Sequence, residues 1–229
     1  PCGPCSEIHI DQGPALGTGP EDVLGGEGDR FLELWNLVFM QYSRAADGTL
    51  TPLPQQNIDT GMGLERIAAI MQGVQSNYDT DLLRPIIAAV EELAEKPYGS
   101  VSPDDVSMRV IADHMRASMF LLCDGVRPEN TGRGYVLRRI IRRAARHGKM
   151  LGFEEPFLYR LVDPVQRVMG RAYPEMEAQN EYVRKMLLGE EERFLHTLHQ
   201  GMRELDSLIA QHREDGTRRI TGTEAFQLY

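Results

Sequence analysis

After Gly61 the apolar residues of this chain recur with the period of an amphipathic helix almost to the end, which restricts the fold more than any other feature. From Asp79 to Lys96, for example, leucine, isoleucine and valine stand three and four residues apart, as on one face of a helix. We predict helices over residues 62–71, 79–96, 103 to about 125, an arginine-rich stretch within 127–149, and 180–212. The last has an apolar stripe formed by Val183, Leu187, Phe194, Leu198, Met202, Leu205 and Ile209.

Residues 1–56 have a different pattern, rich in glycine and proline with short strand-like runs. Strands are predicted over residues 6–11, 31–42 and 49–53, with a hairpin turn at Asp47-Gly48. The second run does not alternate strictly, as expected for a strand buried on both faces near its middle. The fold class is therefore α+β: part of an antiparallel sheet followed by an all-helical domain, with the boundary near residues 73–77.

The charge of the chain is unevenly distributed. The net charge is −9, yet Arg127 to Lys149 holds eight basic residues against Glu129, a local charge of +7 that leaves −16 in the remainder. Phosphate backbones are bound by local positive potential. This segment could therefore bind a polyanion in spite of the acidic total.

Cysteine content and hydropathy indicate the compartment. Three cysteines, Cys2, Cys5 and Cys123, are too few for a disulfide framework, and no apolar run is long enough to span a membrane. We predict a cytoplasmic protein with no membrane partner. Because the sequence begins at Pro1, we also expect an internal fragment of a longer protein.

The segment Asn57-Ile-Asp-Thr-Gly-Met-Gly-Leu-Glu-Arg66 joins a strand to a helix through two glycines. Glycines let the backbone approach a ligand, and a helix N-terminus with an arginine favours an anion. A Gly-x-Gly alone is explained better by a tight turn. The whole string, however, resembles motif 3 of class II aminoacyl-tRNA synthetases in its alanyl form.

This resemblance implies roles for individual residues. Arg66 would contact the ATP phosphates, Asp59 would pair with the ammonium group of alanine, and Gly61 lies where the backbone approaches the substrate. Trp35-Asn36-Leu-Val38 resembles the family's Trp-Asn-x-Val, so Asn36 and Val38 would line the alanine pocket. Glu33 is a candidate ligand for the Mg²⁺ that accompanies ATP. The family also implies zinc, but in an editing domain outside these residues, so no metal site is predicted here.

The basic segment forms a helix with two faces. At about 100° per residue, the row of Arg138, Arg142 and Arg146 lies beside Arg139 and Arg143, opposite an apolar side. A solvated face with ion pairs is the usual explanation of such a run. Here the helix contains no acid of its own, and like charges at this spacing cost stability. An external polyanion is the explanation we favour.

The segment from Asp124 to Ala144 resembles the alanyl family's domain for the tRNA acceptor stem. Asn130 matches the asparagine that recognises the G·U pair of alanine tRNA, and Arg133 and the five arginines would contact phosphates. Asn130 could instead, or in addition, cap the following helix. In the family the partner of this asparagine is an aspartate after a Leu-Tyr, and this sequence ends at Leu228-Tyr229.

The resemblance implies an alanine–tRNA ligase that uses ATP and Mg²⁺. Residues 1–76 would be the C-terminal part of its catalytic domain and residues 77–229 its acceptor-stem recognition domain. Because class II motifs 1 and 2 are not among these residues, we expect the 229 residues alone to be inactive. Two alternatives are an RNA-binding module and a non-synthetase relative that kept the fold, the second disfavoured by the intact motif 3.

Overall fold

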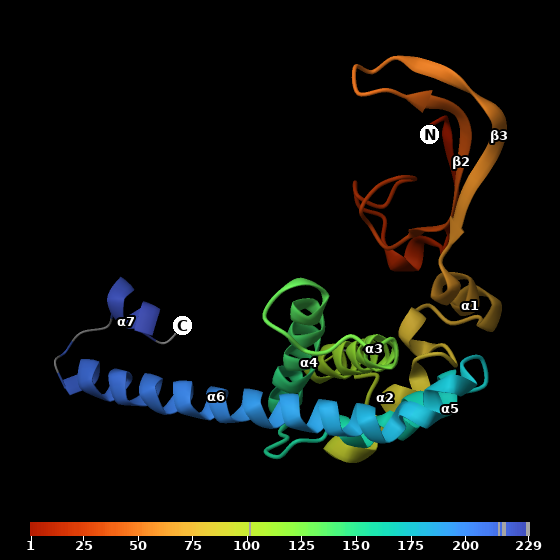
Figure 1. Cartoon of the computed structure of the whole chain (residues 1–229). Coiled ribbons are helices and arrows are strands. Elements are labelled where there is room, and N and C mark those ends of the chain that lie inside the picture. The colour runs from red at the N-terminus through yellow and green to blue at the C-terminus, as the bar shows by residue number, and fades with distance from the viewer. Residues whose placement is uncertain (101, 215, 217–218, 228–229) are drawn as a thin grey trace. The chain divides into compact units, whose positions relative to one another are not determined.

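The computed structural model describes residues 1–100, 102–214, 216 and 219–227 of the chain (Figure 1). They form two compact units, Pro1–Thr80 and Asp81–Tyr229. The sequence placed the corresponding boundary at residue 76. Together the units give a mixed α+β structure with an antiparallel sheet, as predicted.

The first unit is built on three antiparallel strands in the order β1-β2-β3, which are β1 (Cys5–Asp11), β2 (Phe31–Arg44) and β3 (Leu50–Met62). The first two predicted strands are confirmed, and so is the predicted hairpin turn at Asp47-Gly48, which joins β2 to β3. At the turn Gly48 has a φ of +87°, and Asp47 Oδ1 accepts a hydrogen bond from Thr49 N at 2.9 Å. β3 is much longer than predicted, because pairing with the long β2 holds a polar stretch of low strand propensity in the sheet.

The prediction that β2 is buried on both faces was wrong. From Phe31 to Tyr42 every residue of β2 is only half-buried. Among the described residues of this unit, Ala69 is the only buried apolar side chain, so little apolar surface is available to cover the strands. Apart from η1 (Pro14–Leu16) and η2 (Asn77–Asp79), the unit adds a single helix, α1 (Leu64–Gln72).

Two helices begin later than their apolar pattern predicted. α1 starts at Leu64 rather than Met62, because Met62 still pairs with Trp35 in the sheet. α2 (Arg84–Ala94) starts five residues after the predicted Asp79, with Pro85 in its first turn. Proline lacks an N–H and disfavours helical backbone at the preceding residue, so Pro85 is tolerated only at a helix start.

The second unit is helical and holds the core. Its further helices are α3 (Pro103–Cys123), α4 (Gly132–Leu151), η3 (Leu158–Leu161), α5 (Val162–Met169), η4 (Pro174–Gln179), α6 (Asn180–Glu214) and α7 (Gly222–Gln227). α3 packs against α4, and α6 runs along α4 and α5 (Figure 1). The largest fully buried side chains include Ile86, Met108, Ile111, Leu137 and Ile141. None of the helices in the described part of the chain has the length and apolarity needed to cross a membrane.

The apolar stripe predicted for α6 packs only in its first half. Val183 and Leu187 are fully buried and Phe194 is half-buried, whereas Met202 is 48% and Ile209 36% exposed. The period of the stripe was read correctly, but a periodic pattern does not say how far along the helix a neighbour extends.

Two glycines allow a matched stability test in the helical unit. Gly152 ends α4 with a φ of +102°, a conformation that costs an L-residue about 1 kcal/mol, so Gly152→Ala should destabilise the unit by about that amount. Gly201 lies inside α6, and no atom lies within 4 Å of the position that an added methyl group would occupy, so Gly201→Ala should stabilise by about 0.5–1 kcal/mol. Urea denaturation measures both, and shifts of the same sign would contradict the assignment.

Candidate functional site

The register of β2 and β3 gathers the predicted alanine-binding residues. Asn36 lies directly opposite Gly61, and Val38 directly opposite Asp59. Residues opposite each other in an antiparallel pair have side chains on the same face of the sheet, and so do residues two apart in a strand. All four positions therefore share one face.

β1 adds two side chains to that face. Cys5 pairs with Val38, and Glu7 pairs with Asn36. The Asn36 Nδ2 group donates to Glu7 Oε1 and to Cys5 Sγ, each at 3.2 Å. Since Nδ2 contacts both acceptors, Oδ1 of Asn36 remains the acceptor end of the amide. The contact between Cys5 and Asn36 could not be predicted from the sequence, because the two residues are 31 positions apart and no local pattern reveals the register between their strands.

Arg66 and Glu33 are in contact. Arg66 Nη1 donates to the main-chain oxygen of Glu33 at 2.6 Å and lies 3.9 Å from the Glu33 carboxylate. The guanidinium of α1 is thereby anchored to β2 near the start of its pairing with β3. Both side chains remain about 40% exposed, so they are accessible to a ligand.

Asp59 is exposed. It lies on β3, an outer strand of the three-stranded sheet, and β3 is exposed along nearly all its length. All three cysteines are free. Among the described residues, groups of three or more His, Cys, Asp or Glu side chains placed to hold a metal were not found.

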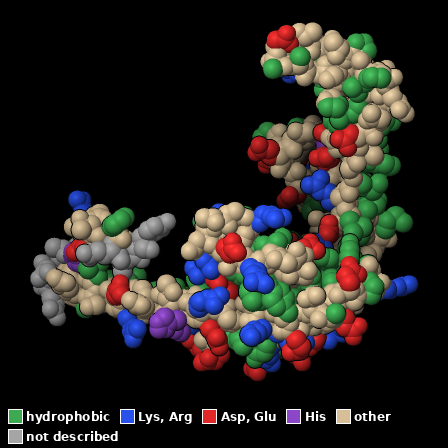
Figure 2. Space-filling model, viewed as in Figure 1, with side chains coloured by type: hydrophobic (Ala, Val, Ile, Leu, Met, Phe, Trp, Pro, Cys, Tyr) green, Lys and Arg blue, Asp and Glu red, His purple; other side chains and the backbone are tan. Residues whose placement is uncertain are grey.

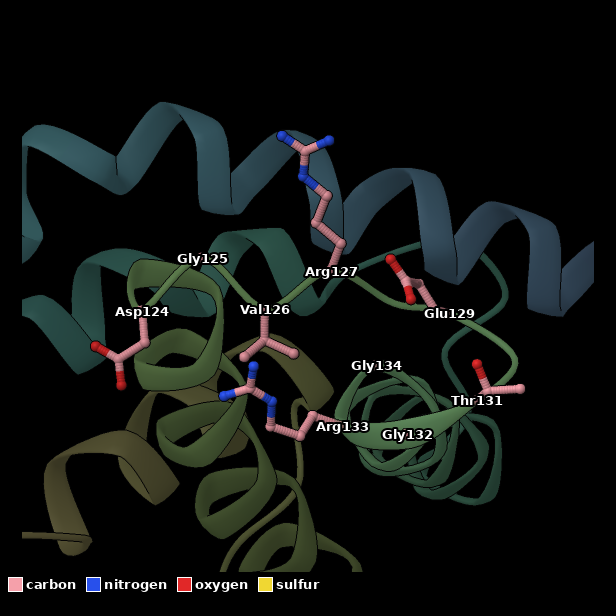
Figure 3. A pocket seen from close by; sticks show the side chains of 9 residues that line it. All are labelled: Asp124, Gly125, Val126, Arg127, Glu129, Thr131, Gly132, Arg133 and Gly134. Atoms are coloured by element: carbon pink, nitrogen blue, oxygen red, sulfur yellow. The ribbon is translucent and has the colours of Figure 1, made fainter.

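In the helical unit, the loop before α4 lines an open surface pocket of about 310 Å³ (Figure 3). The loop closes on the helix through a hydrogen bond from Glu129 N to the main-chain oxygen of Gly134, at 3.1 Å. An added methyl at Gly134 would lie 2.4 Å from the oxygen of Arg127, so only glycine permits this approach. The lining residues are Asp124, Gly125, Val126, Arg127, Glu129, Thr131, Gly132, Arg133 and Gly134.

Asn130 projects from this loop and is exposed. The N-cap position of α4 is Thr131, so the alternative in which Asn130 caps the helix was wrong. Its Oδ1 atom instead accepts a hydrogen bond from Arg138 Nη1. Arg138 Nη2 also donates to the main-chain oxygen of Pro128 at 3.1 Å, so one guanidinium holds two points of the loop.

The arginine helix does not present all five guanidinium groups freely. Arg138 and Arg142 both contact Glu190 of α6, whose side chain is fully buried. For these two arginines the ion-pair alternative applies: the helix has no acid of its own, but α6 supplies one. Of these five arginines, Arg139, Arg143 and Arg146 remain exposed, and Arg133 in the first turn of α4 is exposed as well.

The exposed arginines create a positive region. Burial lowers the pKa of His147, and the neighbouring charges of Arg143 and Arg146 lower it further. Figure 2 shows basic side chains gathered over the middle of the helical unit. His196 and His199 are exposed on α6. Leu228 and Tyr229, noted in the sequence, lie outside the described residues.

Comparison with known proteins identifies the family. A model described as tRNA synthetases class II (A) matches residues 1–229. The alanine–tRNA ligases of Methylococcus capsulatus and Halorhodospira halophila are 56% and 52% identical over the whole chain, and that of Acidithiobacillus ferridurans is 55% identical over 92% of it. The chain spans about a quarter of the length of these relatives, 26%, 26% and 24% respectively. It therefore belongs to the class II (A) family of tRNA synthetases.

Proposed function

We propose that this chain is part of an alanine–tRNA ligase, which activates alanine with ATP and transfers it to tRNA. The observation that carries the proposal is the strand register, which places Asn36, Val38, Asp59 and Gly61 on one face of the sheet. The relatives that match the whole chain are named for the same activity. We further propose that residues 1–76 serve as the C-terminal part of the catalytic domain.

In this proposal the sheet face binds alanine. The Asp59 carboxylate pairs with the α-ammonium group through a charge-assisted hydrogen bond, and its exposure leaves it open to the substrate. Asn36 and Val38 line the pocket around the methyl group. Asn36 is held by Glu7 and Cys5, so its amide has a fixed orientation.

Arg66 is the proposed contact for the ATP phosphates, and Glu33 for the accompanying Mg²⁺. The hydrogen bond from Arg66 to β2 fixes the guanidinium on the sheet, which suits a group that must meet the phosphates in one geometry. Its positive charge would stabilise the negative charge that develops as pyrophosphate leaves.

We propose residues 77–229 as the domain that recognises the tRNA acceptor stem. Asn130 would recognise the G·U pair. The phosphate contacts would come mainly from the exposed arginines Arg133, Arg139, Arg143 and Arg146. Arg138 and Arg142, which are paired with Glu190, would contribute less to phosphate binding. The exposed asparagine beside exposed arginines supports this division between base recognition and backbone binding.

Binding of acceptor-stem hairpins tests the recognition role. A hairpin with the G·U pair should bind about tenfold more tightly than one with G·C, the cost expected for one wrong base pair. Exchanging Arg143 for Ala should weaken both hairpins alike and reduce the salt dependence by about one phosphate contact. Fluorescence anisotropy at several salt concentrations measures these quantities. Equal affinity for the two hairpins would leave only a general RNA-binding module.

A further inference from the structure

A buried carboxylate of α6, that of Glu190, contacts two arginines of α4. The Glu190 side chain is fully buried, and its carboxylate contacts the guanidinium groups of three arginines. Its Oε1 accepts from Arg142 Nε at 2.8 Å, and its Oε2 accepts from Arg193 Nη2 at 2.8 Å. Arg138 Nε lies 3.2 Å from Oε1, in ion-pair contact although not aligned as a hydrogen bond. One buried negative charge therefore organises three positive ones.

Arg138 connects Glu190 to the loop before α4. Its Nε faces Glu190, whereas Nη1 donates to Asn130 Oδ1 and Nη2 to the oxygen of Pro128. Both Nη atoms of the guanidinium therefore donate hydrogen bonds to the loop, and Nε is in ion-pair contact with Glu190. Because the planar guanidinium is rigid, fixing Nε on Glu190 also fixes the directions of the other two nitrogens.

The contact with Arg138 determines which end of the Asn130 amide is free. A guanidinium has only donors, so the amide atom that it contacts must be the oxygen. The Nδ2 group of the exposed Asn130 then remains to donate two hydrogen bonds outward. The minor groove of a base pair offers acceptors at purine N3 and pyrimidine O2, and RNA adds the 2′-hydroxyl.

We propose that Glu190 is a positioning residue for acceptor-stem recognition, which fixes Arg138 so that Arg138 presents Nδ2 of Asn130 to an acceptor in the RNA minor groove. The inference rests on the proposed role of Asn130. The carboxylate does not touch the RNA, and it acts only through Arg138.

The net charge of the Glu190 cluster allows a positioning role to be distinguished from a role in packing alone. One carboxylate among three guanidinium groups leaves an excess of two positive charges, so the cluster still attracts phosphates. Neutralising Glu190 increases that attraction while it releases Arg138. Selectivity and affinity should therefore change in opposite directions, whereas a loss of packing would lower both.

The test compares three variants of the 229-residue chain. Glu190→Gln removes the charge, and Arg138→Lys keeps the charge of residue 138 but cannot hold the carboxylate and the amide at once. Glu192→Gln is the matched control, since Glu192 is exposed on the same helix and loses the same charge. The ratio of dissociation constants for the G·C and G·U hairpins is measured at one salt concentration, with circular dichroism to establish folding.

We expect the ratio to fall about tenfold in Glu190→Gln and in Arg138→Lys, the size of one lost base-edge contact. The affinity of Glu190→Gln for the G·C hairpin should be unchanged or higher, and Glu192→Gln should keep the wild-type ratio. If Glu190→Gln weakens both hairpins equally and keeps the ratio, the proposal is overturned.

A second measurement does not depend on RNA. In ¹⁵N NMR spectra, the Nε–H of Arg138 and the Nδ2 group of Asn130 should shift in Glu190→Gln and stay in place in Glu192→Gln. Unchanged signals in Glu190→Gln would overturn the positioning role. If the signals shift but the wild-type chain does not distinguish the two hairpins, the positioning of Asn130 stands and the proposed function of the loop fails.

Discussion

Exchanging Asp59 for Asn in the complete ligase is expected to lower kcat/KM for alanine by about 100-fold in ATP–pyrophosphate exchange. The α-ammonium group loses its charged partner, and a hydrogen bond to a charged group contributes about 1.5–3 kcal/mol, which corresponds to roughly 10- to 100-fold. The upper end applies because the Asn side chain also turns donors toward a cation. The KM for ATP should change little, since the phosphates are assigned to Arg66.

Asp47→Asn is the matched control for this prediction. It makes the same chemical change in the same hairpin, at the turn between β2 and β3. There the carboxylate accepts from Thr49 N, a bond that an Asn oxygen can also make. Activity close to wild type is expected. Equal exchange by wild type and Asp59→Asn would remove Asp59 from the alanine site.

The alanine site shows what a sequence pattern can predict. Asn36 and Val38 lie two apart in one strand, and so do Asp59 and Gly61, which places each pair on one face whatever the partner. Whether the two pairs lie on the same face depends on the register between β2 and β3, and a one-residue slip would put them on opposite faces. The polar composition of β3 gave no sign that the strand continues from Leu50 to Met62, and only its pairing with β2 holds it there.

In the arginine helix the sequence predicts the two faces but not the residue that pairs with its arginines. Its two faces were predictable from the helical period: on its apolar side Leu137, Ile141, Ala144 and Ala145 are buried, and Ile140 is half-buried. The partner of Arg142 was not predictable, because Glu190 lies 48 residues later in a helix whose other acids are mostly exposed. A buried carboxylate is recognised only when the helices are packed together.

Glu191, the residue that follows Glu190, should contribute stability to the helical unit that is lost as the pH rises from about 5 to 7. Glu191 is 1% exposed, and its Oε2 accepts from the main-chain N–H groups of Phe157 and Leu158 at 3.1 and 3.0 Å. Burial raises its pKa from 4.5 to about 7, against the opposing effect of these two hydrogen bonds.

The raised pKa determines the sign. Between about pH 4.5 and 7 the folded state keeps a proton on Glu191 that the unfolded chain has already lost, so unfolding becomes easier as the pH rises. The contribution is fully present below pH 4.5 and lost above about 7. At 1.36 kcal/mol for each pH unit it amounts to about 3 kcal/mol. The lowered pKa of His147 acts in the opposite direction, so the total pH dependence of the wild type is not diagnostic by itself.

Glu191→Gln isolates this contribution, since glutamine keeps an oxygen that can accept from Phe157 and Leu158 but does not titrate. The free energy of unfolding is measured by urea denaturation at pH 5, 6, 7 and 8 for wild type, Glu191→Gln and the exposed control Glu192→Gln. The difference between wild type and Glu191→Gln should shift by about 3 kcal/mol across this range in favour of the variant at high pH, while Glu192→Gln follows the wild type. A constant difference would mean that Glu191 has the same pKa in the folded and unfolded chain, and that its two backbone hydrogen bonds are made by a carboxylate at every pH tested.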